Sequence, residues 1–484
     1  MEMEPFHLYT LCAVLVVSSS LYLLRQVLAS GRRNLPPGPR PLPLVGNLLG
    51  LGAHPHRSLA RLAARHGPLM ALRLGAVTTV VASSAGAARD VLQRHDATLS
   101  ARSVPDAVRA GANDDHSMAW LPPGSPRWRA LRKACSAELF APRRLDAHRP
   151  LRRDKMRRLV SHVAQLAREG AAVDVSRVAF TTVVNVLSCA IFSADLADLD
   201  DRGTSGAFKG VIQEYTVAVG LRAHLGKVFK KLHAIFDEQI ERRMKERGDG
   251  EAPKNDFLDL LLDYRGAEDG RGFARQTLLS LITDLFSAGS DSSAATVEWA
   301  MAELLQNPSS MAKARDELAQ VIGSKQEIEE SDIGQLGYLQ AIVKETFRLH
   351  PAVPLLLPHQ AETTTEVRGY TVPRGARVLV NVWAIGRDRE LWPEPEKFMP
   401  ERFLEKEIDF RGKDFELLPF GSGRRICPGM LLADRMVHLI LATLLHRFKW
   451  RLPANVGKNE LDMTENFGAV LGLATPLQAI AEPI

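Results

Sequence analysis

The sequence predicts a mainly helical protein with small β-sheets, preceded by a single N-terminal transmembrane helix. Three observations support this class. Helical patterns dominate most of the chain up to about residue 350. Strand character is confined to Met70 to Ser83, on both sides of Gly75, and to Val367 to Val382. A long apolar run comes before all of these segments, at the N-terminus.

The domain organisation follows from the composition of the first 45 residues. After them, no linker-like stretch divides the chain of 484 residues, so one large domain is compatible with this length. We therefore expect a membrane anchor at residues 1–24, a basic and proline-rich hinge at residues 25–44, and a single catalytic domain at residues 45–484.

The apolar run extends from Leu8 to Leu24, which is near the lower limit for a helix that spans a bilayer. Acidic residues precede the run, whereas Arg25, Arg32 and Arg33 follow it. The positive-inside rule then leaves the N-terminus outside and the body of the protein in the cytosol. A cleavable signal peptide is the alternative, but such peptides carry lysine or arginine before their apolar run. The prolines that follow form a stiff, extended stretch.

The net charge of +6 and the many arginines between residues 127 and 158 raise the question of a nucleic-acid partner. Few aromatic residues are interleaved with these cations, so we expect no nucleic acid and interpret the segment as a solvated face. A docking surface for an acidic electron-transfer partner or for anionic lipid is the sharper alternative. Four scattered cysteines without a CxxC pair argue against a disulfide scaffold and favour a reducing compartment.

One cysteine, Cys427, lies in a glycine-rich loop directly before a predicted helix from Met430 to Phe448. A thiolate at this place would meet unpaired backbone N–H groups and the positive end of the helix dipole. The glycines at positions 421, 423 and 429 would let the backbone approach a bulky, flat group. An axial thiolate ligand to haem iron requires such surroundings, although a free buried cysteine is the simpler alternative.

The loop spells Phe-x-x-Gly-x-Arg-x-Cys-x-Gly and thus resembles the haem-binding signature of the cytochrome P-450 monooxygenases, with Phe420, Gly423, Arg425, Cys427 and Gly429 at the fixed positions. The anchor, the basic stop and the proline hinge resemble the start of the endoplasmic-reticulum members, especially those of plants. The resemblance implies the cytochrome P-450 fold and heme b (iron protoporphyrin IX) with Cys427 as the iron ligand. It also implies a single-pass protein of the endoplasmic-reticulum membrane with a cytosolic catalytic domain, which takes electrons from NADPH through NADPH–cytochrome P-450 reductase.

The stretch from Thr277 to Leu305 predicts a long buried helix, with a polar cluster from Ala288 to Ser293 in its middle. Buried polar groups are costly unless they are used, but a helix break capped by Asp291 or Ser292 is an equal alternative. In the family that the chain resembles, Gly289 opens space for dioxygen, and Asp291 and the next hydroxyl deliver protons. Ser292 departs from the usual threonine. Because serine has more freedom about χ1, we expect looser coupling of electrons to product.

Glu345 and Arg348 are three residues apart on a predicted helix that ends before Pro351, so they face the same way. An ordinary surface pair worth less than about 1 kcal/mol is the common interpretation of this spacing. The family resemblance instead implies a buried network that includes Arg402 and braces the cysteine loop from beneath. We favour the network, because all three parts occur in the expected order.

Haem carries two propionates, which require cationic donors. The resemblance implies contacts from Arg425, from the pair Trp128 and Arg132 one helical turn apart, and from His359. For Trp128 and Arg132 the alternative is a packed helix face with a solvated arginine. For His359 the alternative is an ordinary hydrogen-bonded histidine.

The substrate pocket follows from the resemblance as well. Its expected walls are Val104 to Leu121, Ser287 to Ser292, Ala352 to Leu357 and Phe467 to Leu473. They are mostly apolar, which suits a hydrophobic small-molecule substrate. A closer resemblance, to the plant geraniol 8-hydroxylase-like group, is carried by Thr296 to Leu305, Ser103 to Trp120 and Thr464 to Gly468. Members of that group mostly oxidise terpenoids, so we expect a terpenoid substrate and keep an alkaloid as the alternative.

One region departs from the family pattern. After Gly220 the chain continues directly into Leu221, where the family has a longer segment that forms the roof of the pocket. A shortened roof would put substrate gating in doubt, and the chain would then bind haem but be catalytically impaired. A haem-thiolate isomerase or dehydratase that needs no dioxygen is a further alternative, against which the acid–alcohol pair argues.

Overall fold

The computed structural model of the protein describes residues 34–110, 114–217, 222–266, 270–454, 457 and 461–484, and a few isolated positions between 9 and 20. Most of the predicted anchor at residues 1–24 and the first part of the hinge lie outside the described residues, so the N-terminal transmembrane helix stays a prediction. Within the described ranges one helix, Val175–Phe192, is long and apolar enough to cross a membrane, but 94% of it is buried inside the protein. Such burial is typical of a core helix.

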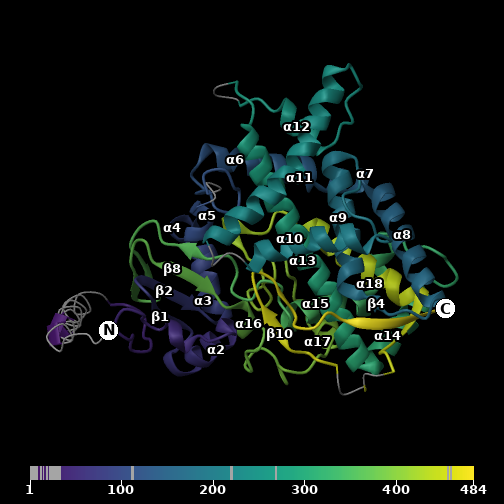
Figure 1. The fold of residues 1–484 in the computed structure, drawn as a ribbon. Coiled ribbons are helices and arrows are strands. Elements are labelled where there is room, and N and C mark those ends of the chain that lie inside the picture. The colour runs from purple at the N-terminus through teal and green to yellow at the C-terminus, as the bar shows by residue number, and fades with distance from the viewer. Residues whose placement is uncertain are drawn as a thin grey trace.

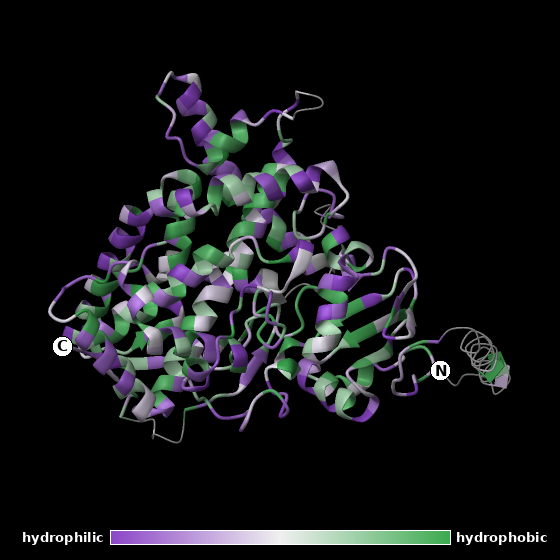
Figure 2. Cartoon of the chain, turned by 180° about the vertical axis from the view of Figure 1, so that it is seen from behind, coloured by the Kyte–Doolittle hydropathy of each residue, from purple (hydrophilic) through white to green (hydrophobic). Residues whose placement is uncertain are grey.

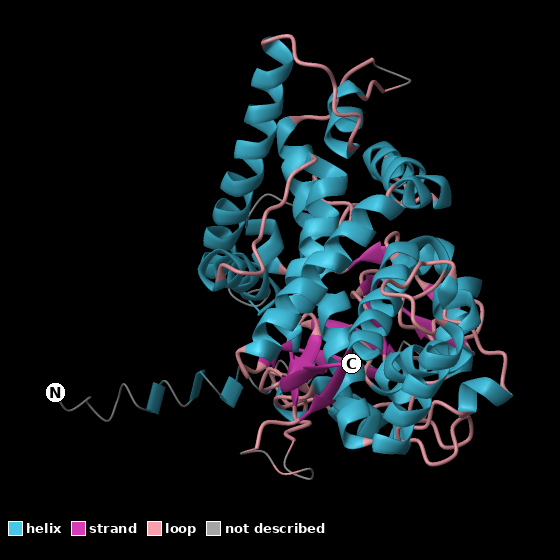
Figure 3. Ribbon diagram, turned by 90° about the vertical axis from the view of Figure 1, so that its right-hand side faces the viewer, coloured by secondary structure: helices cyan, strands magenta, loops and turns pink. Residues whose placement is uncertain are grey.

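Helices dominate the described part of the chain, as Figure 3 shows, and the predicted class of a mainly helical protein with small sheets is confirmed. The α-helices are α2 (Pro55–His66), α3 (Ala85–Arg89), α4 (Asp96–Leu99), α5 (Asp106–Ala110), α6 (Pro126–Ala134), α7 (Pro142–Ala147), α8 (Arg149–Arg168), α9 (Val175–Phe192), α10 (Arg202–Val217), α11 (Arg222–Gly248), α12 (Phe257–Asp263), α13 (Arg275–Gln306), α14 (Pro308–Val321), α15 (Gly337–Leu349), α16 (Val382–Ile385), α17 (Arg402–Glu405) and α18 (Met430–Arg447). Short 3-10 or π-helical turns, such as η2 (Asp90–Arg94) and η6 (Gly423–Arg425), join some of them.

The strands are short and form several small sheets. They are β1 (Leu69–Leu74), β2 (Val77–Ala82), β3 (Ala101–Arg102), β4 (Val173–Asp174), β5 (His359–Gln360), β6 (Thr365–Val367), β7 (Tyr370–Val372), β8 (Arg377–Val380), β9 (Phe448–Arg451), β10 (Glu465–Phe467), β11 (Leu471–Leu473) and β12 (Gln478–Pro483). The largest sheet has the order β1-β2-β8-β5-β3. Its hairpin β1–β2 turns at Gly75, which has a φ of +61°. Both regions with predicted strand character are therefore confirmed.

The sheet and the helical core lie beside each other. In Figure 1 the sheet strands β1, β2 and β8 lie at the left of the view, and the long helices α9, α13 and α18 lie to their right. Phe286 of α13 stacks on Phe192 of α9 and on Phe236 of α11, with ring centroids 6.0 and 5.0 Å apart. Each fully buried phenylalanine stabilises the fold by about 1.5–3 kcal/mol. The predicted helix from Thr277 to Leu305 is continuous as α13, so the alternative of a break at its polar cluster is wrong.

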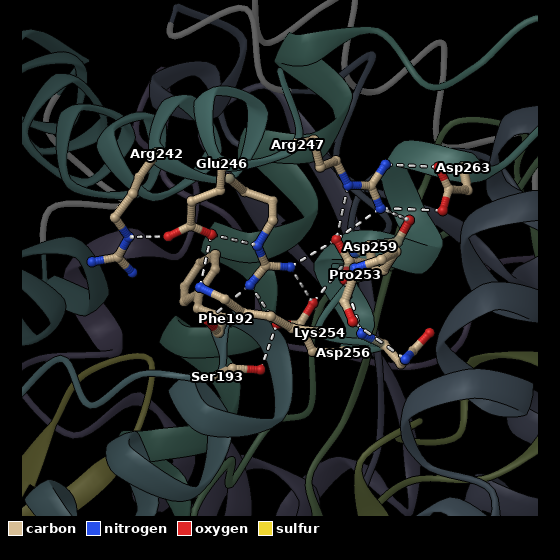
Figure 4. A network of polar contacts seen from close by, with 12 residues as sticks. Phe192, Ser193, Arg242, Glu246, Arg247, Pro253, Lys254, Asp256, Asp259 and Asp263 are labelled. Carbon is tan, nitrogen blue, oxygen red and sulfur yellow. Dashed lines mark hydrogen bonds and ion pairs between the residues drawn. The ribbon is translucent and has the colours of Figure 1, made fainter. Parts of the chain in front are cut away.

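Helices α11 and α12 project from the core at the top of Figure 1, and their outer parts are largely hydrophilic in Figure 2. A network of ion pairs joins them, which Figure 4 shows from close by. Arg243 of α11 contacts Asp256 at 2.6 Å and Asp259 at 2.8 Å. Arg247, one turn further along, contacts Asp259 and Asp263, each at 2.7 Å. Every carboxylate here faces an arginine, so the network fixes α12 against the end of α11.

The basic segment between residues 127 and 158 is not a uniformly solvated face, which corrects that interpretation. Arg152 is fully buried, and its guanidinium binds the Glu330 carboxylate with an Nε to Oε1 distance of 2.5 Å. Lys155 is also buried and lies 2.8 Å from Asp195. A charged side chain is buried only when it is paired, and the sequence alone does not reveal partners that lie far along the chain.

Candidate active site

The predicted iron ligand lies where the sequence places it, between the turn η6 and the start of α18. The backbone N–H of Cys427 donates to the carbonyl of Phe420 at 3.0 Å, which closes the loop. Burial raises the pKa of the Cys427 thiol, while N–H groups of Gly429 and Met430 that bond to the sulfur and the nearby Arg132 act in the opposite direction. A half-buried sulfur with N–H donors aimed at it is suited to a metal-bound thiolate, because a cation completes the charge balance.

The structure requires the glycines of the loop around Cys427 for different reasons. Gly423 has a φ of +68°, and a Cβ on it would lie 2.1 Å from the Leu92 carbonyl oxygen of η2. Packing against η2 therefore already requires this glycine, and the approach of the loop to a bound flat group stays a prediction. Gly429 differs, because a Cβ there would lie 3.7 Å from the Phe140 ring and 4.0 Å from the Cys427 sulfur. Its missing side chain keeps space open near the sulfur.

The middle of α13 has an accessible face within an otherwise buried helix. Ala288 is exposed and Gly289 and Ser292 are half-buried, whereas Ser287, Ser290 and Ser293 are buried. The accessible residues share one side of the helix, so this side borders open space. The Ser292 hydroxyl donates to the Ala288 carbonyl at 2.6 Å.

Asp291 faces helix α10. It is 9% exposed, and burial raises its pKa, while Lys209 and a hydrogen bond with Gln213 oppose the shift. Lys209 and Gln213 lie one helical turn apart on α10, so one face of α10 meets the acid. The acid and the hydroxyl of the predicted pair are neighbours in the chain but bind different partners.

Gly289 packs against α9. A Cβ at this position would come within 3.0 Å of the Leu187 Cδ1 atom. The glycine therefore lets α9 and α13 approach closely. Its predicted role in opening space for dioxygen stays a prediction beside this packing role.

The predicted bracing network is present and buried. Arg348 contacts Glu345 with an Nε to Oε2 distance of 2.7 Å, and Arg402 contacts Glu345 Oε1 at 3.0 Å. Glu345 and Arg348 are almost completely inaccessible, so the alternative of a surface pair is wrong. Phe347, between the two on α15, packs edge-on against Phe420 with ring centroids 5.3 Å apart. The network thus holds the helix on which the cysteine loop rests.

The predicted propionate residues gather on the other side of the loop. Arg132 donates to the Ile426 carbonyl at 2.7 Å, next to Cys427. Arg425 donates to the Ser100 carbonyl at 2.9 Å, and its guanidinium lies 5.1 Å from the centre of the Trp128 ring. The indole N–H of Trp128 donates to the Met118 carbonyl at 3.1 Å. Trp128 would therefore have to give up this bond to contact a propionate directly.

The structure adds Arg102, which sequence reasoning missed. Strand β3 pairs with β5 so that Arg102 lies opposite His359. Burial and the neighbouring Arg425 lower the pKa of Arg102 well below its ordinary value. Burial, together with Arg102, lowers the pKa of His359 to about 3 and keeps its imidazole neutral. No local motif marks Arg102, and only strand pairing brings it to the site.

The three arginines 102, 132 and 425 fit the propionates of haem. Within the described ranges no carboxylate lies within 4.0 Å of their guanidinium groups, and backbone carbonyls are their only hydrogen-bond partners there. Burial and Arg132 lower the pKa of Arg425 to about 10. Half-buried cations without an anion are partly desolvated at a cost, and two carboxylates from a ligand would reduce that cost. The described residues contain no cluster of three or more His, Cys, Asp or Glu side chains that could hold a metal ion.

Comparison with known proteins identifies the family. The family model described as Cytochrome P-450 matches residues 36–478. The chain is 43% identical over 501 residues to geraniol 8-hydroxylase of Swertia mussotii, covering 99% of this chain and 100% of that protein. It is 44% identical over 493 residues to geraniol 8-hydroxylase of Catharanthus roseus, covering 97% of this chain and 98% of that protein. The family implies a haem cofactor. The chain belongs to the cytochrome P-450 family and is a cytochrome P-450 monooxygenase.

Proposed function

We propose that the protein hydroxylates a neutral, lipophilic plant metabolite of the terpenoid class, with dioxygen and with electrons that an NADPH-dependent reductase supplies. The observation that carries the proposal is the Cys427 sulfur in its N–H-lined loop beside three half-buried arginines that have no carboxylate partner among the described residues. The geraniol 8-hydroxylases that resemble the chain along its length support the terpenoid class.

Different residues of the chain would bind the iron, bind the propionates and deliver protons. Bound haem would activate dioxygen and transfer one oxygen atom to the substrate. Cys427 would hold the iron, and Arg102, Arg132 and Arg425 would hold the propionates. Ser292 would donate a proton from the accessible face of α13. Asp291, whose pKa burial raises, would exchange protons on the side of α10.

The acids of α13 favour a neutral substrate over an amine alkaloid. The one Ser117 hydroxyl hydrogen is donated to the Asp284 carboxylate, with the hydroxyl oxygen 2.9 Å from Oδ1 and 2.8 Å from Oδ2, and Asp291 is hydrogen-bonded to Gln213. Both carboxylates already have partners within the protein, and burial raises the pKa of each, that of Asp284 to about 7, which disfavours the charge that a substrate ammonium group would pair with. The half-buried Leu355 and Leu356 belong to the expected pocket walls and offer only apolar contacts.

A haem-binding but catalytically impaired protein is the second candidate. The alignment with the Swertia mussotii enzyme spans 501 residues, whereas this chain has 484, so at least 17 aligned positions have no residue here. Helix α10 ends at Val217 and α11 begins at Arg222, and Glu214 contacts His224 at 2.9 Å across the junction. The short connection between α10 and α11 in the sequence supports the absence of the longer segment that forms the roof of the pocket in the family. The junction at residues 218–221 lies outside the described residues.

The location that we propose is the endoplasmic-reticulum membrane, with residues 1–24 as a single-pass anchor and the domain in the cytosol. The apolar run and the arginines that follow it support this topology. Leu44, the last residue of the hinge, and Leu49 are each 75% exposed, and Leu42 and Leu48 beside them in the chain are exposed as well. Several exposed leucines in so short a stretch suit a membrane surface.

The test is turnover in yeast microsomes that carry the chain together with a plant reductase. We expect the reduced-CO absorption band of a thiolate haem and NADPH-dependent hydroxylation of geraniol or a related terpenoid. The matched variant Cys427→Ser is expected to lose both. A band without NADPH consumption on any terpenoid would favour the impaired candidate. Turnover of cationic amines but not of terpenoids would contradict the substrate class, and product without NADPH would indicate an isomerase or dehydratase.

A further inference from the structure

Asp284 is a buried carboxylate of α13 that the chemistry described above does not use. It is 8% exposed and lies one heptad before Asp291, so the two acids occupy the same side of the helix two turns apart. Asp291 interacts with Lys209 and Gln213 of α10, whereas Asp284 is hydrogen-bonded to the segment 117–121, which precedes α6. Two aspartates of the same helix side thus contact different parts of the pocket.

The carboxylate of Asp284 receives hydrogen bonds from consecutive residues of one segment. The Ser117 hydroxyl lies 2.9 Å from Oδ1 and 2.8 Å from Oδ2, and the N–H of Ala119 donates to Oδ2 at 3.3 Å. The N–H of Met118 bonds to the same carboxylate. Ser117 is fully buried, so no water competes for these bonds.

The carbonyl groups of the same segment bind the haem-side cations. Met118 accepts from the Trp128 indole at 3.1 Å and from Arg425 at 3.4 Å. Ala119 accepts from Arg102 Nε at 3.3 Å, and Leu121 accepts from the second amino group of Arg425. The N–H groups of the segment thus bind Asp284, and its carbonyl groups bind the side chains that the propionates need.

We propose that Asp284 is a positioning residue for haem: it fixes the backbone of residues 117–121, and this backbone aims Arg102 and Arg425 at the propionates. The inference rests on the haem-thiolate function proposed above. The two arginines have no described acid partner to orient them, so their direction depends on these carbonyl groups. If the segment is released, each long side chain regains rotamer freedom, and part of the hold on the propionates is lost.

The test compares Asp284→Asn with the matched variant Asp291→Asn, one heptad further along the same helix side. The asparagine keeps the size of the side chain but replaces one acceptor oxygen with an NH2 group, which cannot accept from the donors of the segment. A buried donor left without its acceptor corresponds to about a tenfold to hundredfold effect, so we expect haem to pass from the holoenzyme to apomyoglobin about 10–100 times faster in Asp284→Asn. Asp291→Asn is expected to keep the wild-type rate of haem loss.

A second readout separates positioning from general stability. Hydrogen–deuterium exchange of the holoenzyme should be faster over residues 114–121 in Asp284→Asn, and unchanged over the distant network of α11 and α12. Ser117→Ala removes only the hydroxyl bonds and should accelerate haem loss in the same direction by less. This variant also serves if Asp284→Asn does not fold.

The outcomes distinguish this inference from the proposed function. If the wild-type protein lacks the thiolate-haem band, the proposed function fails. If the wild-type band is normal and both Asp284→Asn and Ser117→Ala lose haem at the wild-type rate, only the positioning role is overturned. Faster haem loss with uniformly faster exchange across the protein would also overturn it, because Asp284 would then be a general stabiliser.

Discussion

Two groups of buried or half-buried arginines in this molecule have opposite surroundings. In the network of α11 and α12, Arg243 and Arg247 face Asp256, Asp259 and Asp263 at 2.6 to 2.8 Å. Near Cys427, Arg102 and Arg425 face backbone carbonyls and no described carboxylate. The hydrogen bonds that Arg243 donates to Asp256 raise the pKa of Arg243, whereas burial and like charges lower the pKa of Arg102 and Arg425.

The difference separates arginines with a structural role, Arg243 and Arg247, from the arginines that we propose bind an anionic ligand, Arg102 and Arg425. A buried ion pair that is complete within the protein has a structural role, and its arginine gains nothing from a further anion. A buried cation without an acid is a cost to the isolated chain and therefore marks a place for an anionic group. The contrast can be tested one residue at a time.

The largest effect is expected at the complete pairs. Arg243→Ala leaves Asp256 and Asp259 buried without their main partner, and we expect a loss of about 3–5 kcal/mol in the free energy of unfolding. Urea titration measures this loss, and haem retention of the folded protein should not change. A loss below about 1 kcal/mol would contradict this prediction, because the network would then contribute no more to stability than an exposed surface ion pair.

The unpaired cations should respond in the opposite way. Arg425→Gln removes one of the proposed propionate donors and leaves no carboxylate without a partner, so haem affinity should fall roughly tenfold to hundredfold while the apoprotein keeps its stability or gains some. Haem titration and urea titration of the apoprotein measure the two quantities. An apoprotein destabilised as strongly as Arg243→Ala would remove the distinction between the two groups.

Glu465 extends the comparison to a shared carboxylate. Burial raises its pKa, but hydrogen bonds from His56 and Arg57 outweigh burial and hold the pKa well below its ordinary value of 4.5. A depressed pKa stabilises the fold above the ordinary value, and this stabilisation is lost as the pH falls below it. We expect Glu465→Gln to be less stable than wild type at pH 7 by about 1–3 kcal/mol, with the difference shrinking below pH 4.5. A difference that does not depend on pH would contradict the role of this charge.

The smallest effect is expected where no charge changes. Ser292→Thr adds one methyl group on the accessible face of α13 and restricts χ1. We expect unchanged stability within about 0.5 kcal/mol and a modest rise in product formed per NADPH consumed. Gly289→Ala serves as its control, since a Cβ there meets Leu187 at 3.0 Å and acts through packing. Equal or poorer coupling in Ser292→Thr would show that the missing methyl group is not the cause of loose coupling.

Local patterns were sufficient for the elements and for most of the predicted site residues. The helix α13, the loop around Cys427 and the helix α18 follow from apolar periodicity and from glycines at fixed spacing. The pair Glu345 and Arg348 follows from helical spacing, although the spacing does not tell a buried pair from an exposed one. Arg152 shows the same limit, because its partner Glu330 lies far along the chain.

By itself, the sequence determined the family, the mainly helical class and the succession of helices and strands, and it predicted Cys427 as the iron ligand. These properties rest on contacts between neighbours in the chain, which composition and spacing describe. Only the tertiary structure decided that Arg102 lies opposite His359 and that the Leu92 carbonyl leaves no room for a side chain at position 423. The hydrogen bonds of Asp284 with the segment 117–121 are also visible only there. Each of these depends on strand pairing or packing between distant segments, and no local pattern specifies which distant groups will meet.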